Sequence, residues 1–362
     1  MGMIRTRILC GGLVLLGCTA GEVAAQSLRL LLPTRNDALL QDDGAGFYQY
    51  VDRIVKGARS QPWEGGRYGF VRNPRETSSG LVYTRFHEGV DIKPIYRDRD
   101  DEPLDTVRVI DYGEVVHANT VERHSNYGKY IVVEHWWDGA PFYSLYAHLN
   151  TVSVAVGQQV EPGDPLGQLG YTGRGINRRR AHVHFEINLL LNEDVQPWYD
   201  AHFKDDDPNY HGIYNGLNLS GLDVAALYLS LREDTTLTIQ DFLLRLPVFL
   251  EVHVPNRGMP DLLWRYPWLS ASFDPWAARF EEGDPHPSWT LTLSRSGLPL
   301  RIEPSAQAVT EPTVDVLAPS SIDYQYLTNG LVTGTGPRGT LTKNGLRYID
   351  LLTRVAPPQD EY

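Results

Sequence analysis

The chain has 362 residues, of which 42% are hydrophobic and 22% charged, so it is long enough for two globular domains with separate cores. Its formal net charge is −12 at pH 7. A general nucleic-acid-binding protein needs a basic face, and the acidic balance therefore argues against that class. We expect no nucleic-acid partner.

The first 25 residues have the layout of a secretory signal. Arg5 and Arg7 precede the apolar run "ILCGGLVLLGCTA", and small residues lead up to Gln26. This run is too short for a stable membrane span. We therefore predict a signal peptide over residues 1–25, a secreted or periplasmic protein, and no transmembrane span after cleavage.

Both cysteines of the chain, Cys10 and Cys18, lie in this segment. The run "LLGC" also resembles a lipoprotein signal that would leave a lipid on Cys18, but Leu16 fits that pattern poorly, so simple secretion is favoured. A mature chain without cysteine has no disulfide, no thiolate nucleophile and no thiolate metal ligand. Any metal ion must then be bound by nitrogen and oxygen atoms.

The next segment, residues 26–65, contains "GFYQYVDRIVKGA" (46–58), which we expect to form an amphipathic helix. From residue 66 to residue 205 the sequence is typical of short strands separated by turns. The glycines and prolines of residues 154–175 favour tight hairpins. The strands that we predict here cover 129–137, 142–149, 151–156 and 181–190.

The composition changes near residue 205, and we predict a separate α+β domain over residues 206–362. Its first helix should begin after Asp223, which is available as an N-cap. The elements that we predict here are helices at 221–234 and 238–246, strands at 248–255, 288–296 and 313–319, and a hairpin at 330–345.

The stretch "AHVHFEIN" alternates apolar and polar residues with period two, which is the pattern of a half-buried strand. His182 and His184 then lie on the same, non-core face, with Cα atoms roughly 6.5–7 Å apart. They are well placed to share a metal ion or a reacting group. One such pair is weak evidence by itself.

Three further motifs precede this pair. "RFHEGVDIKP" contains His87 and Asp91, "YSLYAHL" contains His148, and "VAVGQQVEPGDPLGQLGYTG" is rich in glycine at fixed spacing. Four motifs in this order resemble the lysostaphin/LytM-type zinc metallopeptidases, which cut peptide cross-bridges in peptidoglycan. The resemblance covers roughly residues 66 to 200.

The resemblance implies that His87, Asp91 and His184 bind one Zn²⁺ per chain and leave a coordination position open for water. It implies that His148 and His182 are the catalytic histidines. It also implies a mainly β protein, in which a small antiparallel sheet with a groove forms the metallopeptidase domain, residues 66–205, ahead of the α+β region. Peptidoglycan stem peptides are the expected partner.

Each residue also has a structural alternative. His87 and Asp91 alone would suggest a local hydrogen bond at a turn. We interpret His135 as structural, and His117 and His124 as surface residues. The pair "HE" at residues 87–88 resembles the helical HExxH zinc motif, but position 91 is Asp and Gly89 disfavours a helix interior.

The chain departs from the family in two places. A long charged insertion, residues 92–110, follows Asp91 and could shape or block the groove. A basic cluster precedes the histidine pair, and it either attracts the carboxylates of stem peptides or offsets the acidic insertion. The cluster consists of Arg174, Arg178, Arg179 and Arg180.

The favoured function is a secreted zinc endopeptidase that cuts cell-wall cross-links, with a D-alanyl–diaminopimelate bond as the favoured target. The main alternative is a non-catalytic peptidoglycan-binding or amidase-activating module. Two others are a functional C-terminal region with an accessory peptidase, and a zinc peptidase that acts on proteins.

Overall fold

The structure is a computed structural model that describes residues 28–203, 208–275 and 286–355. The predicted signal peptide, with Cys10 and Cys18, lies outside these residues. Within them, no helix has the length and apolar character that crossing a bilayer requires.

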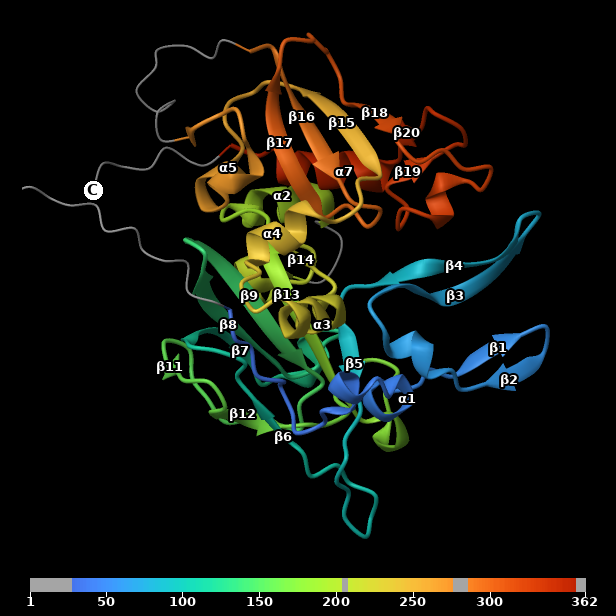
Figure 1. Cartoon of the computed structure of the whole chain (residues 1–362), viewed down its shortest axis with the longest axis vertical. Coiled ribbons are helices and arrows are strands. Elements are labelled where there is room, and N and C mark those ends of the chain that lie inside the picture. The colour runs from blue at the N-terminus through green and yellow to red at the C-terminus, as the bar shows by residue number, and fades with distance from the viewer. Residues whose placement is uncertain (1–27, 204–207, 276–285, 356–362) are drawn as a thin grey trace, which may run out of the picture.

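The protein is mainly β, as predicted, and its centre is a seven-stranded antiparallel sheet (Figure 1). The strand order is β11-β7-β8-β9-β13-β14, and β5 also pairs with β13. The strands predicted at 129–137, 142–149 and 181–190 are confirmed as β8, β9 and β13. The bounds are β5 Val90–Ile92, β7 Gly113–Asn119, β8 Tyr130–Trp137, β9 Ala140–Ala147, β11 Gln159–Val160, β13 Val183–Leu190 and β14 Leu219–Gly221.

Both faces of this sheet are buried, and the expectation of a half-buried strand at 181–190 is wrong in that respect. Val183 and Phe185 join the large core on one face. The polar residues of β13 point to the other face, where Tyr130 and Leu145 belong to a second core. Residues around Tyr214 cover this second face from a later part of the chain, so the alternation marks two buried faces with different chemistry.

A second sheet of three strands, in the order β10-β12-β6, flanks the first. The strand predicted at 151–156 is shorter than expected, and residues 154–175 do not pair with each other as a hairpin. Instead β11 pairs with β7, and β12 pairs with both β6 and β10. The turns at Gly157 and Gly163, with φ of 86° and 91°, send each short strand to a different neighbour. The bounds are β6 Thr106–Arg108, β10 Thr151–Val152 and β12 Pro165–Gln168.

The helix predicted at 46–58 is wrong. Lys56 and Gly57 have φ of 51° and 79°, which is the geometry of a two-residue hairpin turn, and the chain forms β1 and β2 around it. A second hairpin, β3–β4, follows and leads into the first site motif. The bounds are η1 Ala38–Gln41, α1 Gly44–Phe47, β1 Arg53–Val55, β2 Ala58–Ser60, η2 Trp63–Gly66, β3 Gly69–Thr77 and β4 Gly80–His87.

The C-terminal part contains a four-stranded antiparallel sheet, β17-β16-β15-β18, with helices beside it (Figure 1). The helix predicted after Asp223 is confirmed as α3, and the Asp223 carboxylate accepts a hydrogen bond from the Ala226 backbone N–H. The other predicted elements correspond to α4, β15, β16, β18 and the β19–β20 hairpin, whereas β17, α5 and α7 were not predicted. Since β14 pairs with β13, the central sheet takes a strand from beyond residue 205, and the domain boundary there stays a prediction.

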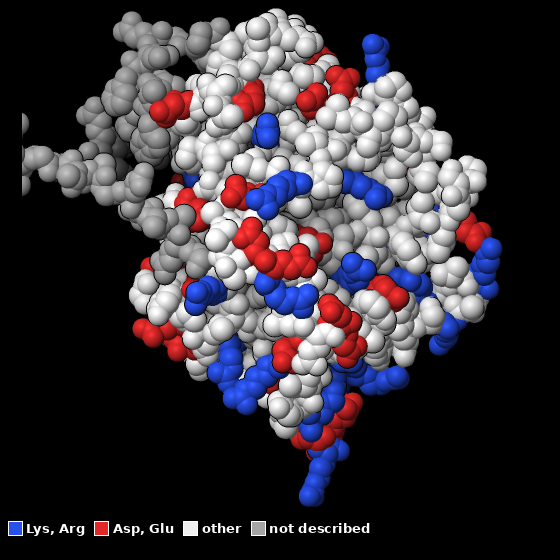
Figure 2. All heavy atoms as spheres, viewed as in Figure 1, with Lys and Arg blue, Asp and Glu red and all other residues white. Residues whose placement is uncertain are grey.

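The bounds in this part are α2 Val195–Phe203, α3 Val224–Glu233, α4 Ile239–Leu244, α5 Asp261–Arg265, α7 Lys343–Leu352, β15 Leu250–Pro255, β16 Ser288–Leu293, β17 Pro299–Ser305, β18 Thr313–Val316, β19 Val332–Thr333 and β20 Thr340–Leu341. Short 3₁₀ turns complete the chain at η3 Glu122–His124, η4 Arg178–Arg180, η5 Gly212–Tyr214, η6 Pro267–Leu269 and η7 Tyr324–Tyr326. On the face that Figure 2 draws, cationic and anionic side chains are interspersed, without a large area of one sign.

Candidate metal centre

Strand β13 lies between β5 and β9, and this placement brings the predicted site residues together. His184 on β13 pairs in register with Asp91 on β5 and with Ala147 on β9. His87 ends β4, three residues before β5 begins. The turn between them contains Gly89, where a Cβ atom would lie only 2.3 Å from the Phe185 carbonyl oxygen, so glycine permits this close approach to β13.

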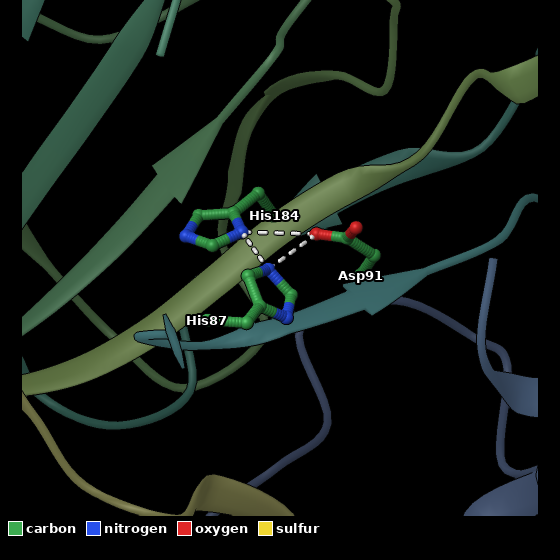
Figure 3. A group of neighbouring side chains, drawn as sticks. All are labelled: His87, Asp91 and His184. Carbon is green, nitrogen blue, oxygen red and sulfur yellow. Dashed lines mark hydrogen bonds and ion pairs between the residues drawn. The ribbon is translucent and has the colours of Figure 1, made fainter. Parts of the chain in front are cut away.

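His87, Asp91 and His184 face one another (Figure 3). His87 Nε2 lies 3.0 Å from His184 Nδ1 and 3.1 Å from Asp91 Oδ1, and His184 Nδ1 lies 2.9 Å from the same oxygen. All three residues are buried. Within the part of the chain that the structure describes, no other group of His, Cys, Asp and Glu residues brings three potential ligand atoms this close together.

The hydrogen bonds around the cluster determine which nitrogen of each ring faces inward. His87 Nδ1 lies 2.8 Å from the Arg67 carbonyl oxygen, to which it donates. His184 Nε2 lies 2.6 Å from Glu186 Oε1 and donates to that carboxylate. The inward atoms are therefore His87 Nε2, His184 Nδ1 and Asp91 Oδ1.

Three inward electron-pair donors repel one another unless a positive charge lies between them. Burial lowers the pKa of His184, but hydrogen bonds to Asp91 and Glu186 outweigh that effect and raise it to about 9. Burial alone would raise the pKa of Asp91, and the nearby His182, His87 and Arg72 bring it well below its usual range. The cluster thus favours positive charge, to which the Arg72 guanidinium beside His87 Nε2 and Asp91 Oδ2 contributes. A proton on His184, or a divalent cation bound by two imidazoles and one carboxylate, can supply more.

His148 and His182 border the same cluster. His182 Nε2 lies 3.4 Å from Asp91 Oδ1, and the ring centroids of His148 and His182 are 4.9 Å apart. In each ring Nδ1 faces a backbone carbonyl, that of Arg180 at 2.6 Å for His182 and that of Thr172 at 2.8 Å for His148. Each Nε2 is therefore the nitrogen that remains to accept or donate a proton within the site.

The backbone of His148 has a φ of 62°, in the left-handed region that non-glycine residues seldom adopt. Strained residues of this kind cluster at functional sites, where the surrounding structure holds them. Burial lowers the pKa of His148 well below its usual value, and nearby His182 and His184 lower it further. His148 is therefore neutral near pH 7.

Sequence reasoning missed two residues that contact the cluster. Glu186 accepts from His184 Nε2, from the Tyr127 hydroxyl at 2.8 Å and from Asn188 Nδ2 at 2.9 Å. Sequence reasoning could have found Glu186, because a residue two positions after His184 lies on the same face of a strand. Arg72 forms an ion pair with Asp91 Oδ2, and no motif in the sequence pointed to it.

The arginines of the basic cluster that precedes His182 do not all have the same kind of contact. Arg178 donates to the Asp100 carbonyl at 2.7 Å and to Glu102 Oε1 at 3.1 Å, so this residue binds the acidic insertion. Arg97 of the insertion donates in return to the Arg178 carbonyl. These contacts favour charge compensation for Arg178, while Arg174 and Arg179 are exposed.

The remaining histidines have structural surroundings. His135 is buried, with Nδ1 2.7 Å from the Tyr112 carbonyl and Nε2 2.7 Å from Ser144 Oγ, which agrees with its structural interpretation. His117 is only half-buried but is not a free surface residue, because its Nε2 lies 3.2 Å from His211 Nδ1. The ring of His124 stacks on Tyr210.

A cleft of about 890 Å³ lies beside the site. It reaches Gly173, the residue after Thr172, whose carbonyl accepts from His148. The residues that line it are Thr120, Val121, Glu122, Arg123, His124, Ser125, Asn126, Lys129, Gly173 and Arg174.

Comparison with known proteins agrees with the motifs. Residues 85–197 match the model of Peptidase family M23. Similar solved structures include the catalytic domain of lysostaphin from Staphylococcus simulans, at 21% identity over 42% of this chain and 85% of that chain, with a TM-score of 0.25. Another is the catalytic domain of the M23 protein EnpA from Enterococcus faecalis, at 18% identity over 38% and 79% of the two chains, with a TM-score of 0.25.

A zinc-containing peptidase from Vibrio cholerae is also similar, at 24% identity over 38% of this chain and 43% of that chain, with a TM-score of 0.23. No curated protein matched the chain. The matched residues include all four motifs and the His87, Asp91 and His184 cluster. Residues 85–197 therefore form a lysostaphin/LytM-type peptidase domain of family M23.

Proposed function

We propose that this protein is a secreted zinc metalloendopeptidase that hydrolyses peptide cross-links of bacterial peptidoglycan. One observation carries the proposal. Five polar side chains from three separated motifs converge at one point of a β-sheet, and three of them offer ligand atoms within 4.8 Å of one another.

In this proposal His87 Nε2, Asp91 Oδ1 and His184 Nδ1 would hold one Zn²⁺. The bound ion would supply Lewis acidity, which polarises a peptide carbonyl and makes water acidic enough to lose a proton near neutral pH. Two histidines and one carboxylate suit zinc, because catalytic zinc sites use three protein ligands and an open position.

His148 and His182 would perform the proton transfers. Since each Nδ1 is committed to a backbone carbonyl, each Nε2 is available to the reacting groups. One neutral imidazole accepts the proton of the attacking water, and the other, protonated, donates a hydrogen bond to the developing oxyanion. The buried surroundings strengthen both interactions.

The cleft beside Gly173 would hold the substrate peptide, and its arginine side chains suit the carboxylates of peptidoglycan stem peptides. A D-alanyl–diaminopimelate link is the favoured bond. The role of residues 206–362 as an accessory domain is part of the same proposal.

The decisive experiment is digestion of purified sacculi from different cell-wall types, followed by mass analysis of the fragments. New amine termini should appear with wild-type protein and disappear with His184→Ala or a chelator. A zinc-loaded protein that releases no fragments from any sacculus, but binds them, would instead support the non-catalytic module. Cleavage of unrelated proteins at equal rate would favour a general protein substrate.

A further inference from the structure

Arg72 on β3 contacts two of the three residues of the candidate metal centre. Its Nη2 forms an ion pair with Asp91 Oδ2 and lies 3.0 Å from His87 Nε2. Its Nε donates to the Gly65 carbonyl at 3.0 Å, so the guanidinium is held from two sides. Among the ion pairs of the described residues, no other Lys or Arg contacts Asp91.

The two oxygens of Asp91 therefore have separate partners. Oδ1 faces the two histidine rings, and Oδ2 faces Arg72. A carboxylate held through one oxygen by a planar guanidinium has little freedom to rotate. The arrangement leaves Oδ1 alone directed at the point where the three ligand atoms meet.

The backbone around Arg72 is shaped to make this contact. The register between β3 and β4 shifts between Phe70 and Arg72, and Asn73 has a φ of 51°. Such bulges re-aim a side chain, and they are common next to active sites. Without this register shift, the side chain of Arg72 would point in a different direction.

Contacts with the C-terminal part fix the hairpin on both sides of Arg72. The guanidinium of Arg295 lies over the Phe70 ring at 4.4 Å, and that of Arg75 lies over the Tyr326 ring at 4.4 Å. At the tip, Ser79 Oγ lies 3.2 Å from Ser321 Oγ. The position of Arg72 is thus braced by a region far away in the sequence.

We infer that Arg72 is a positioning residue of the metal centre, which clamps the outer oxygen of Asp91 so that the inner oxygen is presented to the ion. The inference rests on the proposed zinc site. Removal of a partner that orients a metal ligand typically weakens metal binding by about 10- to 100-fold. The opposite model, in which the guanidinium merely repels the ion, predicts tighter binding when Arg72 is replaced.

The test measures zinc affinity by competition with a chromophoric chelator for the full mature chain. The variants are Arg72→Met, Arg72→Lys, the matched control Arg85→Met and the ligand-loss control His184→Ala. Arg85 is the exposed register partner of Arg72 on β4, so its replacement removes the same charge from the same hairpin.

We expect Arg72→Met to bind zinc about 10- to 100-fold more weakly, Arg72→Lys to lie between it and the wild type, and Arg85→Met to match the wild type. The visible spectrum of the cobalt-loaded protein should change in Arg72→Met at saturation and remain unchanged in Arg85→Met. Circular dichroism identifies any variant that fails to fold. If Arg72→Met does not fold, the test rests on Arg72→Lys, which should bind zinc more weakly than the wild type.

Wild-type or tighter zinc binding by the folded Arg72 variants would overturn the inference, as would an equal loss in Arg85→Met. Failure of the proposed zinc site is a different result, because the wild type and His184→Ala would then bind zinc equally poorly, and failure of the proposed hydrolysis would show as zinc-loaded wild type that releases no fragments. The two ideas can therefore fail separately.

Discussion

Glu186 gives the sharpest prediction, because its carboxylate contacts the outer nitrogen of His184, Nε2, and not the inward nitrogen, Nδ1. Its Oε1 accepts from His184 Nε2 and from the Tyr127 hydroxyl, and its Oε2 accepts from Asn188 Nδ2. The side chain is buried. Replacement by glutamine keeps the shape and an acceptor at Oε1 but removes the negative charge.

The new amide group can be accommodated. Asn188 Oδ1 has no hydrogen-bond partner in the described structure, so a rotation of the Asn188 amide would let that oxygen accept from the glutamine NH₂. The substitution therefore tests charge rather than an unpaired donor. A hydrogen bond to a charged group contributes about 1.5–3 kcal/mol and a neutral one about 0.5–1.5 kcal/mol, so we expect a loss of about 1 kcal/mol.

A loss of about 1 kcal/mol corresponds to roughly fivefold weaker zinc binding. Chelator competition measures this difference directly. The control is Glu114→Gln on β7, an exposed carboxylate whose Oε2 accepts from Gln159 at 2.7 Å, and it should leave zinc affinity unchanged. Equal zinc affinity in Glu186→Gln and the wild type would refute a role for this carboxylate in orienting His184.

Three further predictions use the same structure. His148→Ala and His182→Ala should each retain stoichiometric zinc yet lose at least about 100-fold in peptide cleavage, measured on sacculi, because in the proposed mechanism these side chains transfer protons rather than bind metal. Burial lowers the pKa of His135 to about 4, so its stabilising contribution is present above pH 6.5 and is lost as the pH falls toward 4. His135→Gln should therefore reduce the pH dependence of the unfolding free energy in that window by about 3 kcal/mol, measured by urea titration at each pH. Asp261→Ala should lower the unfolding free energy by about 3 kcal/mol, because it leaves the guanidinium of Arg265, 2.7 Å away and buried, without its closest carboxylate.

Each of these predictions has a contrary result. Zinc loss in His148→Ala or His182→Ala would make those residues ligands rather than proton carriers. An unchanged slope of stability against pH in His135→Gln would assign the acid sensitivity to other groups. Wild-type stability of Asp261→Ala would show that the buried pair with Arg265 contributes nothing net.

The histidine pair could be placed from sequence because alternation along a strand is a local property. Ala181 to Asn188 alternate strictly, and the strand β13 follows that pattern. The burial of its polar face was not predictable in the same way, since the covering side chains come from residues such as Tyr127 and Tyr214, which are distant in sequence.

The convergence of His87, Asp91 and His184 was expected through family resemblance rather than through local pattern. Neither local pattern nor family resemblance predicted Arg72. It lies on a hairpin outside the family motifs, and its direction depends on a bulge and on contacts with Arg295 and Tyr326. The helix wrongly predicted at 46–58 has a different cause, because apolar spacing was weighed above the Lys56–Gly57 turn.

The central claim is that His87, Asp91 and His184 would hold one divalent ion on which peptide hydrolysis depends. Its most direct test measures zinc content and release of amine termini from sacculi in parallel, for wild-type protein and His184→Ala. We predict one zinc per chain with steady release for the wild type, and neither for the variant. Undiminished release by metal-stripped protein would contradict the account.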